Sequence, residues 1–354
     1  MTLDFTPACF QQLLLQWFDL HGRKHLPWQE NKTPYRVWVS EIMLQQTQVS
    51  TVIPYFNRFM QQFPDLSSLA HAKEDAVLHL WAGLGYYSRA RNLHRAAQIV
   101  CDRFAGAFPN ALSELQTLPG IGQSTAGAIL SIAFNVPAPI LDGNVKRVLS
   151  RLHGISDPIN EKNTEIRLWE LAKQYTPTGR IADYTQAMMD LGATLCTRSQ
   201  PQCHLCPMKT YCIAYATNQV DTIPAKKTVR KLPVRTATFL ILRRNDEVLL
   251  CKRPPTGIWG GLWGLPELAG QAEKESIHTF CQKQYQITIR GIKTLPSFRH
   301  TFSHYHLTIF PVIADVQRVP IKIMDDSRQI WYHPHEPAPI GLPKPVQTIM
   351  SMLI

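Results

Sequence analysis

The first two-thirds of the chain place apolar residues at spacings of three and four, which is the period of an amphipathic helix. Proline and glycine interrupt this pattern at Pro27, Pro34, Pro54, Pro64, Gly83, Gly85 and Pro109. We therefore expect a mainly α-helical domain over residues 1–222. The segments that show the helical period are Phe10–Leu20, Val37–Ile53, Lys73–Leu80, Ala90–Phe104 and Gln123–Phe134.

After residue 233 the period of the pattern changes to two, as it does in β-strands. Strands are expected at Thr236–Leu242, Glu247–Lys252 and His304–Ala314, and helices at Ala272–Tyr285 and Pro345–Leu353. The residues between the two patterns are polar, basic and bracketed by prolines, which is typical of a linker. The sequence thus predicts a linker over 223–233 and an α+β domain over 234–354.

Composition and charge are those of a globular protein with a polyanionic partner. Of the 354 residues, 45% are hydrophobic and 18% charged, and no apolar run is long enough for a membrane span. The net charge is +11, and its distribution is uneven. Residues 1–225 hold 19 Lys and Arg against 17 Asp and Glu, whereas residues 226–354 hold 18 against 9. A basic excess of this kind is typical of proteins that bind nucleic acid.

Four of the eight cysteines form the pattern C-x6-C-x2-C-x5-C, at Cys196, Cys203, Cys206 and Cys212. Four thiolates this close in sequence suit one iron–sulfur cluster. Structural zinc more often uses two tight pairs, and only Cys203 and Cys206 form one. Disulfides are the remaining alternative, but the chain opens without a secretory signal, so we expect a reducing, cytoplasmic location. The other four cysteines are scattered, as free thiols are.

Two further motifs bear on phosphate binding and on acid–base chemistry. Leu118-Pro-Gly-Ile-Gly-Gln-Ser-Thr-Ala126 places Gly120 and Gly122 in a tight turn before a helix, whose free N–H groups suit a DNA phosphate.

Glu41 lies beside the apolar stripe of its helix, where lost solvation favours the protonated carboxyl of a general acid. Asp142 precedes a helical segment, as an N-cap does, and capping would keep its carboxylate fixed and ionised.

Taken together, these motifs resemble those of the helix-hairpin-helix, iron–sulfur DNA glycosylases, and among them the MutY-type adenine DNA glycosylases. The resemblance covers nearly the whole chain. Two features select the subfamily. Ser124 stands where endonuclease III-like members carry the lysine that forms a Schiff base, and a serine cannot form an imine. The region around Gly257–Glu267 resembles a Nudix domain, without the paired glutamates of its catalytic signature downstream. The motifs are Leu26–Trp28, Ser40–Gln48, Gly83–Ala90, Leu118–Gly122, Leu141–Val145 and the cysteine loop.

The resemblance implies a base-excision-repair enzyme that removes adenine mispaired with 8-oxoguanine or guanine and leaves an abasic site without cutting the strand. The target base would be flipped out of the duplex. Glu41 would protonate adenine N7, and Asp142 would stabilise the oxocarbenium-like sugar. Asn144 would support this pair. The implied partner is double-stranded DNA, and the protein is expected to be a nucleoid-associated monomer with no membrane contact.

The resemblance also implies roles for residues that contact the DNA and the cofactor. One [4Fe-4S] cluster would be held by the four cysteines. DNA contacts are expected from Gln45, Gln46, Tyr86, Arg89, Gly120, Gly122 and Ser124, with Tyr86 as the wedge. Trp28 and Gln186 would line the adenine pocket, and Phe302, Ser303 and His304 would recognise the lesion.

Three other functions fit parts of this pattern. A bifunctional endonuclease III-like glycosylase and lyase would need a lysine near position 124. The pair Glu41 and Asp142 argues against a non-catalytic lesion-binding protein, which needs no acid and no carboxylate. The glycine hairpin argues against an electron-transfer protein, which needs no phosphate site.

Overall fold

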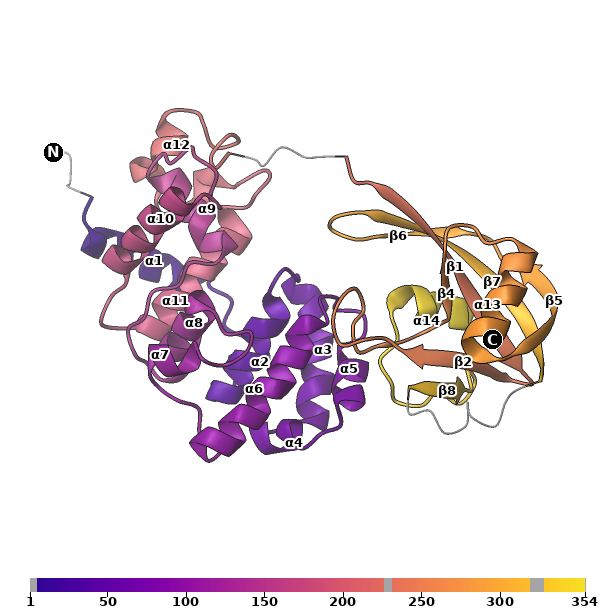
Figure 1. The fold of residues 1–354 in the computed structure, drawn as a ribbon. Helices are drawn as coiled ribbons and strands as arrows, with labels where there is room; N and C mark the ends of the chain where they lie inside the picture. The colour runs from indigo at the N-terminus through magenta and orange to yellow at the C-terminus, as the bar shows by residue number, and fades with distance from the viewer. Residues whose placement is uncertain (1–4, 226–230, 319–327, 354) are drawn as a thin grey trace. The chain divides into compact units, whose positions relative to one another are not determined.

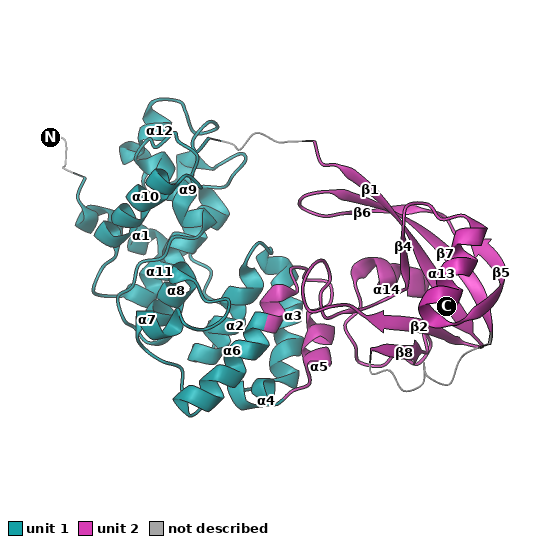
Figure 2. Cartoon of the chain, viewed as in Figure 1, with its two compact units in different colours: residues 1–71, 92–228 teal, residues 72–91, 229–354 magenta. Residues whose placement is uncertain are grey.

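The computed structural model describes residues 5–225, 231–318 and 328–353 (Figure 1). The chain divides into two compact units, which Figure 2 shows in different colours. The first unit comprises residues 1–71 and 92–228, and the second comprises residues 72–91 and 229–354. Part of the expected linker, residues 226–230, lies outside the described residues, and the expected domain boundaries stay a prediction.

The first unit is helical, as its apolar period predicts. A core runs between its helices and buries Phe10, Leu14, Val148, Leu168 and Tyr184. The helices are α1 (Pro7–His21), α2 (Pro34–Leu44), α3 (Val49–Gln62), α4 (Leu66–Ala70), α6 (Ser88–Phe104, whose first turn is in the second unit), α7 (Leu112–Leu115), α8 (Gln123–Ala133), α9 (Gly143–Leu152), α10 (Lys162–Tyr175), α11 (Ile181–Asp190) and α12 (Ile213–Ala216). A π-helical turn, η1 (Leu191–Leu195), follows α11, and the 3-10 turns η2 (Cys203–Leu205) and η3 (Lys209–Tyr211) lie in the cysteine loop.

The periodic run Val37–Ile53 forms two helices and not one. Helix α2 ends at Leu44, and α3 begins at Val49. Between them Gln46 adopts a left-handed conformation with φ of +57°, which an α-helix cannot continue through. The interpretation of Pro54 as a helix boundary is wrong, because it lies inside α3.

The second unit is an α+β unit, which confirms the second part of the expected fold. Its described residues form an eight-stranded mixed sheet in which β1 (Val234–Arg244) and β7 (His306–Arg318) pair in parallel. The other pairs are antiparallel and involve β2 (Glu247–Lys252), β3 (Trp263–Gly264), β4 (Glu267–Ala269), β5 (Thr288–Thr294), β6 (Phe298–Thr301) and β8 (Gln329–Tyr332). Helix α13 (Lys274–Tyr285) buries Ile277 and Cys281 in a core shared with the sheet, and α14 (Lys344–Ser351) follows β8.

Helix α5 (Glu74–Trp81) belongs to this second unit although it comes early in the chain. Its Asp75 pairs with Lys252 at 2.9 Å and accepts a hydrogen bond from the Trp263 indole at 3.3 Å. Its His79 donates from Nδ1 to the carbonyl of Ile340 at 3.1 Å. The second unit is therefore built from two separate stretches of sequence. Within the described part of the chain, no helix is both long enough and apolar enough to cross a membrane.

Candidate active site

Asp142 is held at the N-terminus of α9, which confirms that it caps this helix. Its Oδ1 accepts the N–H of Val145 at 2.8 Å, and its Oδ2 accepts from Asn144 Nδ2 at 3.1 Å. The residue before it is fixed as well, because Leu141 N–H donates to Ser124 Oγ on α8 at 3.0 Å. Both carboxylate oxygens are thus oriented by the fold before any ligand arrives.

Burial and capping act in opposite directions on the pKa of Asp142. Burial raises the pKa of Asp142, and the hydrogen bonds from Val145 and Asn144 offset this only in part. A buried carboxylate loses hydration that two or three hydrogen bonds do not fully replace. Capping therefore acts in the expected direction, because its hydrogen bonds lower the pKa of Asp142, but the opposite effect of burial is larger. The positive charge of Arg147 adds to these hydrogen bonds and favours the ionised form.

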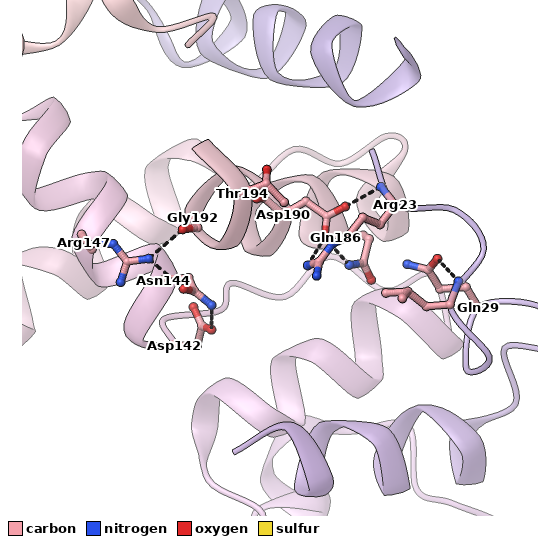
Figure 3. Close-up of polar contacts among 10 residues, drawn as sticks. Arg23, Gln29, Asp142, Asn144, Arg147, Gln186, Asp190, Gly192 and Thr194 are labelled. Carbon is pink, nitrogen blue, oxygen red and sulfur yellow. Dashed lines mark hydrogen bonds and ion pairs between the residues drawn. The ribbon is translucent and has the colours of Figure 1, made fainter. Parts of the chain in front are cut away.

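Arg147 connects the Asp142 region to the cysteine loop, and Figure 3 shows its contacts with Asn144 and Gly192. Its Nη2 donates to Asn144 Oδ1 at 2.8 Å and to the Gly192 carbonyl at 2.7 Å, and its Nε donates to the Cys196 carbonyl at 2.7 Å. The backbone comes so close here that a Cβ on Gly192 would lie 2.5 Å from Asn144 Cβ. Sequence reasoning missed Arg147, although its position three residues after Asn144 places both on one face of α9.

Glu41 lies on α2, whose start is set by the Thr33 cap and by Pro34 in its first turn. The side chain is half-buried, between the buried Trp38 and Ile42 in sequence. Burial raises the pKa of Glu41 to about 8, and the charge of Asp142 contributes to the rise. At neutral pH the protonated carboxyl therefore predominates, as a general acid requires. The same interaction shows that Glu41 and Asp142 share one electrostatic environment.

A second polar group surrounds Gln186, one of the expected adenine-pocket residues. Its Nε2 donates to Asp190 Oδ1 at 2.9 Å. Asp190 is fully buried and is held by Arg23. The Nε and Nη2 atoms of Arg23 donate to Oδ1 at 2.9 and 2.6 Å, and its backbone N–H donates to Oδ2 at 2.7 Å. Gln186 and Gln29 both line a cavity of about 380 Å³, which Glu41 and Asp142 do not line. Trp28, the other expected pocket residue, is buried with its ring against Phe56 at 5.4 Å.

The glycine hairpin has the geometry of a phosphate site. Gly120 has a φ of +80°, and Gly122 is the N-cap of α8, where a Cβ would meet nothing within 4 Å. The N-terminal N–H groups of α8 can therefore be approached closely by an anion. Gln45 and Gln46 follow the end of α2 and do not lie on a helix face, and Gln45 Nε2 is 3.5 Å from Thr125 Oγ1 on α8. This places Gln45 beside the hairpin.

The four cysteines lie close enough to affect one another's ionisation. Burial raises the pKa of Cys203 and Cys212, and that of Cys206 to about 12, and the charges of neighbouring cysteines add to each rise. Arg151, which is 3% exposed, donates to the Thr197 carbonyl at 2.7 Å and lies 3.4 Å from Cys196 Sγ. Partly buried thiols that repel one another as thiolates suit a positively charged inorganic centre. Among the residues that the structure describes, no three His, Cys, Asp or Glu side chains gather closely enough for a single metal ion.

Two further groups of expected site residues lie in the second unit. Tyr86 is 48% exposed and has a φ of +49°, which holds its ring out from the turn before α6. Arg89 is buried, donates to the carbonyls of Leu84 and Gly85 at 3.2 Å, and lies over the Tyr86 ring. Its guanidinium thus supports the turn that presents Tyr86.

The expected lesion-recognition residues lie in the loop between β6 and β7. Ser303 and His304 are exposed, and Ser303 Oγ is 3.4 Å from His304 Nδ1. Phe302 is packed beneath them, with its ring 5.1 Å from that of Trp259 and 4.6 Å from that of Tyr305. The loop therefore presents two polar side chains on an aromatic base.

Comparison with known proteins identifies both parts of the chain. Residues 39–174 match the model of the HhH-GPD superfamily of base excision DNA repair proteins, and residues 237–352 match that of the NUDIX domain. A solved structure of a thermostable thymine-DNA glycosylase is similar with a TM-score of 0.55 and 26% identity, covering 60% of this chain and 97% of that chain. The fold and the site thus define a helix-hairpin-helix DNA repair protein with a Nudix-like second part.

Full-length relatives narrow this class further. An adenine DNA glycosylase of Buchnera aphidicola subsp. Acyrthosiphon pisum (strain APS) is 42% identical over 346 residues, which is 98% of each chain. The adenine DNA glycosylase of Mus musculus is 34% identical over 361 residues, covering 85% of this chain and 69% of that one. The chain therefore belongs to the adenine DNA glycosylase family.

Proposed function

We propose that the protein hydrolyses the N-glycosidic bond of adenine mispaired with 8-oxoguanine or guanine in duplex DNA. The observation that carries this proposal is the raised pKa of Glu41 beside the capped carboxylate of Asp142. One protonated and one fixed carboxyl are what cleavage of a glycosidic bond requires. Membership of the adenine DNA glycosylase family supports adenine as the base.

In the proposed mechanism Glu41 donates its proton to adenine N7, which makes the base a better leaving group. The C1′–N9 bond then breaks, its electron pair goes to the adenine, and positive charge develops on the sugar. This charge favours the ionised form of Asp142, which stabilises it across a short distance of low dielectric. Water adds to C1′ and returns a proton to Glu41, leaving an abasic site and neutral adenine.

Neighbouring residues support this pair. Asn144 holds Asp142 Oδ2, and Arg147 holds Asn144, so the carboxylate does not need to reorganise during the reaction. Ser124 uses its oxygen to accept the N–H of Leu141 and offers no amine for a Schiff base. This supports base removal without strand cleavage.

The partner in this proposal is double-stranded DNA, bound by a monomer in the cytoplasmic nucleoid. The N-terminus of α8 behind Gly120 and Gly122 would hold a backbone phosphate, with Gln45 and Gln46 beside it. Tyr86 would enter the base stack as a wedge. Ser303 and His304 would hydrogen-bond to 8-oxoguanine, whose N7–H and C8 carbonyl distinguish it from guanine.

We further propose that Cys196, Cys203, Cys206 and Cys212 hold one [4Fe-4S] cluster. Four partly buried thiols that would repel one another as thiolates fit such a group. When bound, the cluster would supply a covalent framework that shapes the loop for phosphate contact through residues such as Arg198 and His204.

Duplexes with adenine opposite 8-oxoguanine, guanine or thymine provide the test. Base loss should be seen as strand breaks only after alkali, and most rapidly opposite 8-oxoguanine. Glu41→Gln should bind the same duplex and release adenine about 10²- to 10⁴-fold more slowly. Breaks without alkali would contradict the monofunctional reaction, and near-normal release by Glu41→Gln would contradict the role of Glu41. Glu170→Gln, an exposed change on α10, is the matched control.

A further inference from the structure

The side chain of Arg151 is a buried positive charge that has no acidic partner. Arg151 lies on α9 and is 3% exposed. Its Nε donates to the Ile223 carbonyl at 2.9 Å, and its Nη1 donates to the Thr197 carbonyl at 2.7 Å. Within the part of the chain that the structure describes, no carboxylate forms an ion pair with it. Two carbonyl groups replace only part of the hydration that a buried cation loses, so this position calls for an anion.

The cysteine loop supplies the atoms that Arg151 faces. Its Nη1 lies 3.4 Å from Cys196 Sγ. Its backbone carbonyl lies 3.4 Å from Cys212 Sγ. Arg151 is thus close to the first and to the last cysteine of the pattern C-x6-C-x2-C-x5-C. Uncharged thiols would not balance the guanidinium, whereas thiolates that bind an inorganic centre would.

Arg147, one turn earlier on α9, has a different electrostatic partner. Burial raises the pKa of Asp142, and the positive charge of Arg147 acts against that rise. Arg147 reaches Cys196 through its carbonyl oxygen and not through its sulfur. Residues four apart lie on one face of a helix, so α9 offers one cation to Asp142 and the next to the cysteine sulfur.

We propose that Arg151 is the counter-cation of the iron–sulfur cluster and that it favours the more reduced state of the cluster. The inference rests on the cluster proposed above. Four thiolates carry more negative charge than the inorganic core carries positive charge, so the complete cluster is an anion. Loss of one electron makes this anion less negative. A fixed positive charge beside a ligand sulfur therefore stabilises the cluster more before that loss than after it, and the reduction potential is raised.

Arg151 has no part in the chemistry of base removal in this scheme. Hydrolysis of a glycosidic bond moves no electrons, so the rate of adenine release does not report on the potential. The quantities that do report are the amount of cluster retained by the protein and the poise at which it loses an electron to an electrode.

The test compares Arg151→Met and Arg151→Lys in the full-length protein, purified without oxygen. Methionine keeps an apolar stem and removes the charge, whereas lysine keeps the charge and loses the planar fork that reaches both carbonyls. Iron and sulfide per chain measure the cluster content, and protein-film voltammetry on graphite measures the potential. At a fixed poise, Arg151→Met should raise the ratio of oxidised to reduced cluster about 10-fold, which is ~59 mV for one electron. Arg151→Lys should stay within about 3-fold of the wild-type ratio.

The comparison of the two variants separates charge from scaffolding. A loss of cluster by Arg151→Met that Arg151→Lys does not share would support the inference as the potential does. Equal behaviour of the two variants in both quantities, or a larger change in Arg151→Lys, would overturn it, because the effect would then follow the hydrogen bonds or be absent. Arg95→Met, the same loss of charge at an exposed position on α6, should leave both quantities unchanged.

The cluster and the role of Arg151 fail in different ways. A wild-type protein without iron and sulfide would contradict the proposed cluster itself. A loaded wild-type protein whose two Arg151 variants behave alike would contradict only this inference.

Discussion

Replacing Glu41 by glutamine is expected to stabilise the folded protein while it slows base removal by about 10²- to 10⁴-fold. The pKa of Glu41 is raised from 4.5, its value in an unfolded chain, to about 8 in the fold. Between these two values the folded state binds more protons than the unfolded state. The free energy of unfolding therefore decreases as the pH rises through this window, by about 1.4 kcal/mol per pH unit.

The size of the effect follows from the width of this window. At pH 7 the wild-type protein has lost roughly 3 kcal/mol relative to pH 4.5, and above pH 8 the loss levels off at roughly 5 kcal/mol. Glutamine has nearly the shape of the protonated carboxyl and does not ionise, so the variant escapes this loss. A group placed for catalysis at the expense of stability is a known pattern in active sites.

Urea unfolding of both proteins at pH 6, 7, 8 and 9, followed by the helical signal of the first unit, measures the difference. We expect Glu41→Gln to be the more stable protein at every pH, with an advantage that grows up to about pH 8 and then stays constant. Glu170→Gln, on the exposed face of α10, should show no such growth. An advantage independent of pH, or a variant less stable than the wild type at pH 8, would refute the desolvation of Glu41.

Three further outcomes are expected. The single-turnover rate of adenine release should fall as the pH rises through about 8, because the Glu41 proton is lost there; a flat pH profile between 7 and 9 would remove Glu41 as the acid. Arg147→Met should slow release about 10-fold or more while duplex binding changes little, since the variant frees Asn144; equal losses in binding and release would argue for general misfolding. Replacing Ser303 and His304 by alanine should lower the preference for 8-oxoguanine over guanine about 10-fold, measured as a ratio of release rates, and an unchanged ratio would exclude the loop from lesion recognition.

The elements with strong local patterns could be predicted from the sequence. The period of three and four over Gln123–Phe134 appears as α8, and the alternation over Glu247–Lys252 appears as β2. The break between α2 and α3 could not be predicted, because it depends on the left-handed backbone of Gln46, and neither glycine nor proline marks it. The apolar pattern continues across the break, since both helices bury apolar side chains.

In the site, too, contacts between residues close in sequence could be predicted, and contacts between distant residues could not. The cap formed by Asp142 is local, and an aspartate before an apolar helical run signals it. The pair of Asp190 with Arg23 joins residues 167 positions apart, and no pattern near either one indicates its partner. An aspartate in the otherwise apolar end of α11 was the one available sign that a buried charge needed a counterion there.

The position of α5 early in the sequence, far from the rest of its unit, affects how this protein can be cut into parts. Because Asp75 and His79 complete the second unit, cleavage within residues 223–233 would yield a C-terminal fragment that lacks one of its own helices. Lys252 would lose its carboxylate, and Gly261 and Gly341, which lie against Leu78, would be exposed to water. The fragment from residue 231 onward should therefore be prone to aggregation, whereas the same nick in an intact molecule should leave both halves associated. Limited proteolysis followed by gel filtration without denaturant would separate these two behaviours.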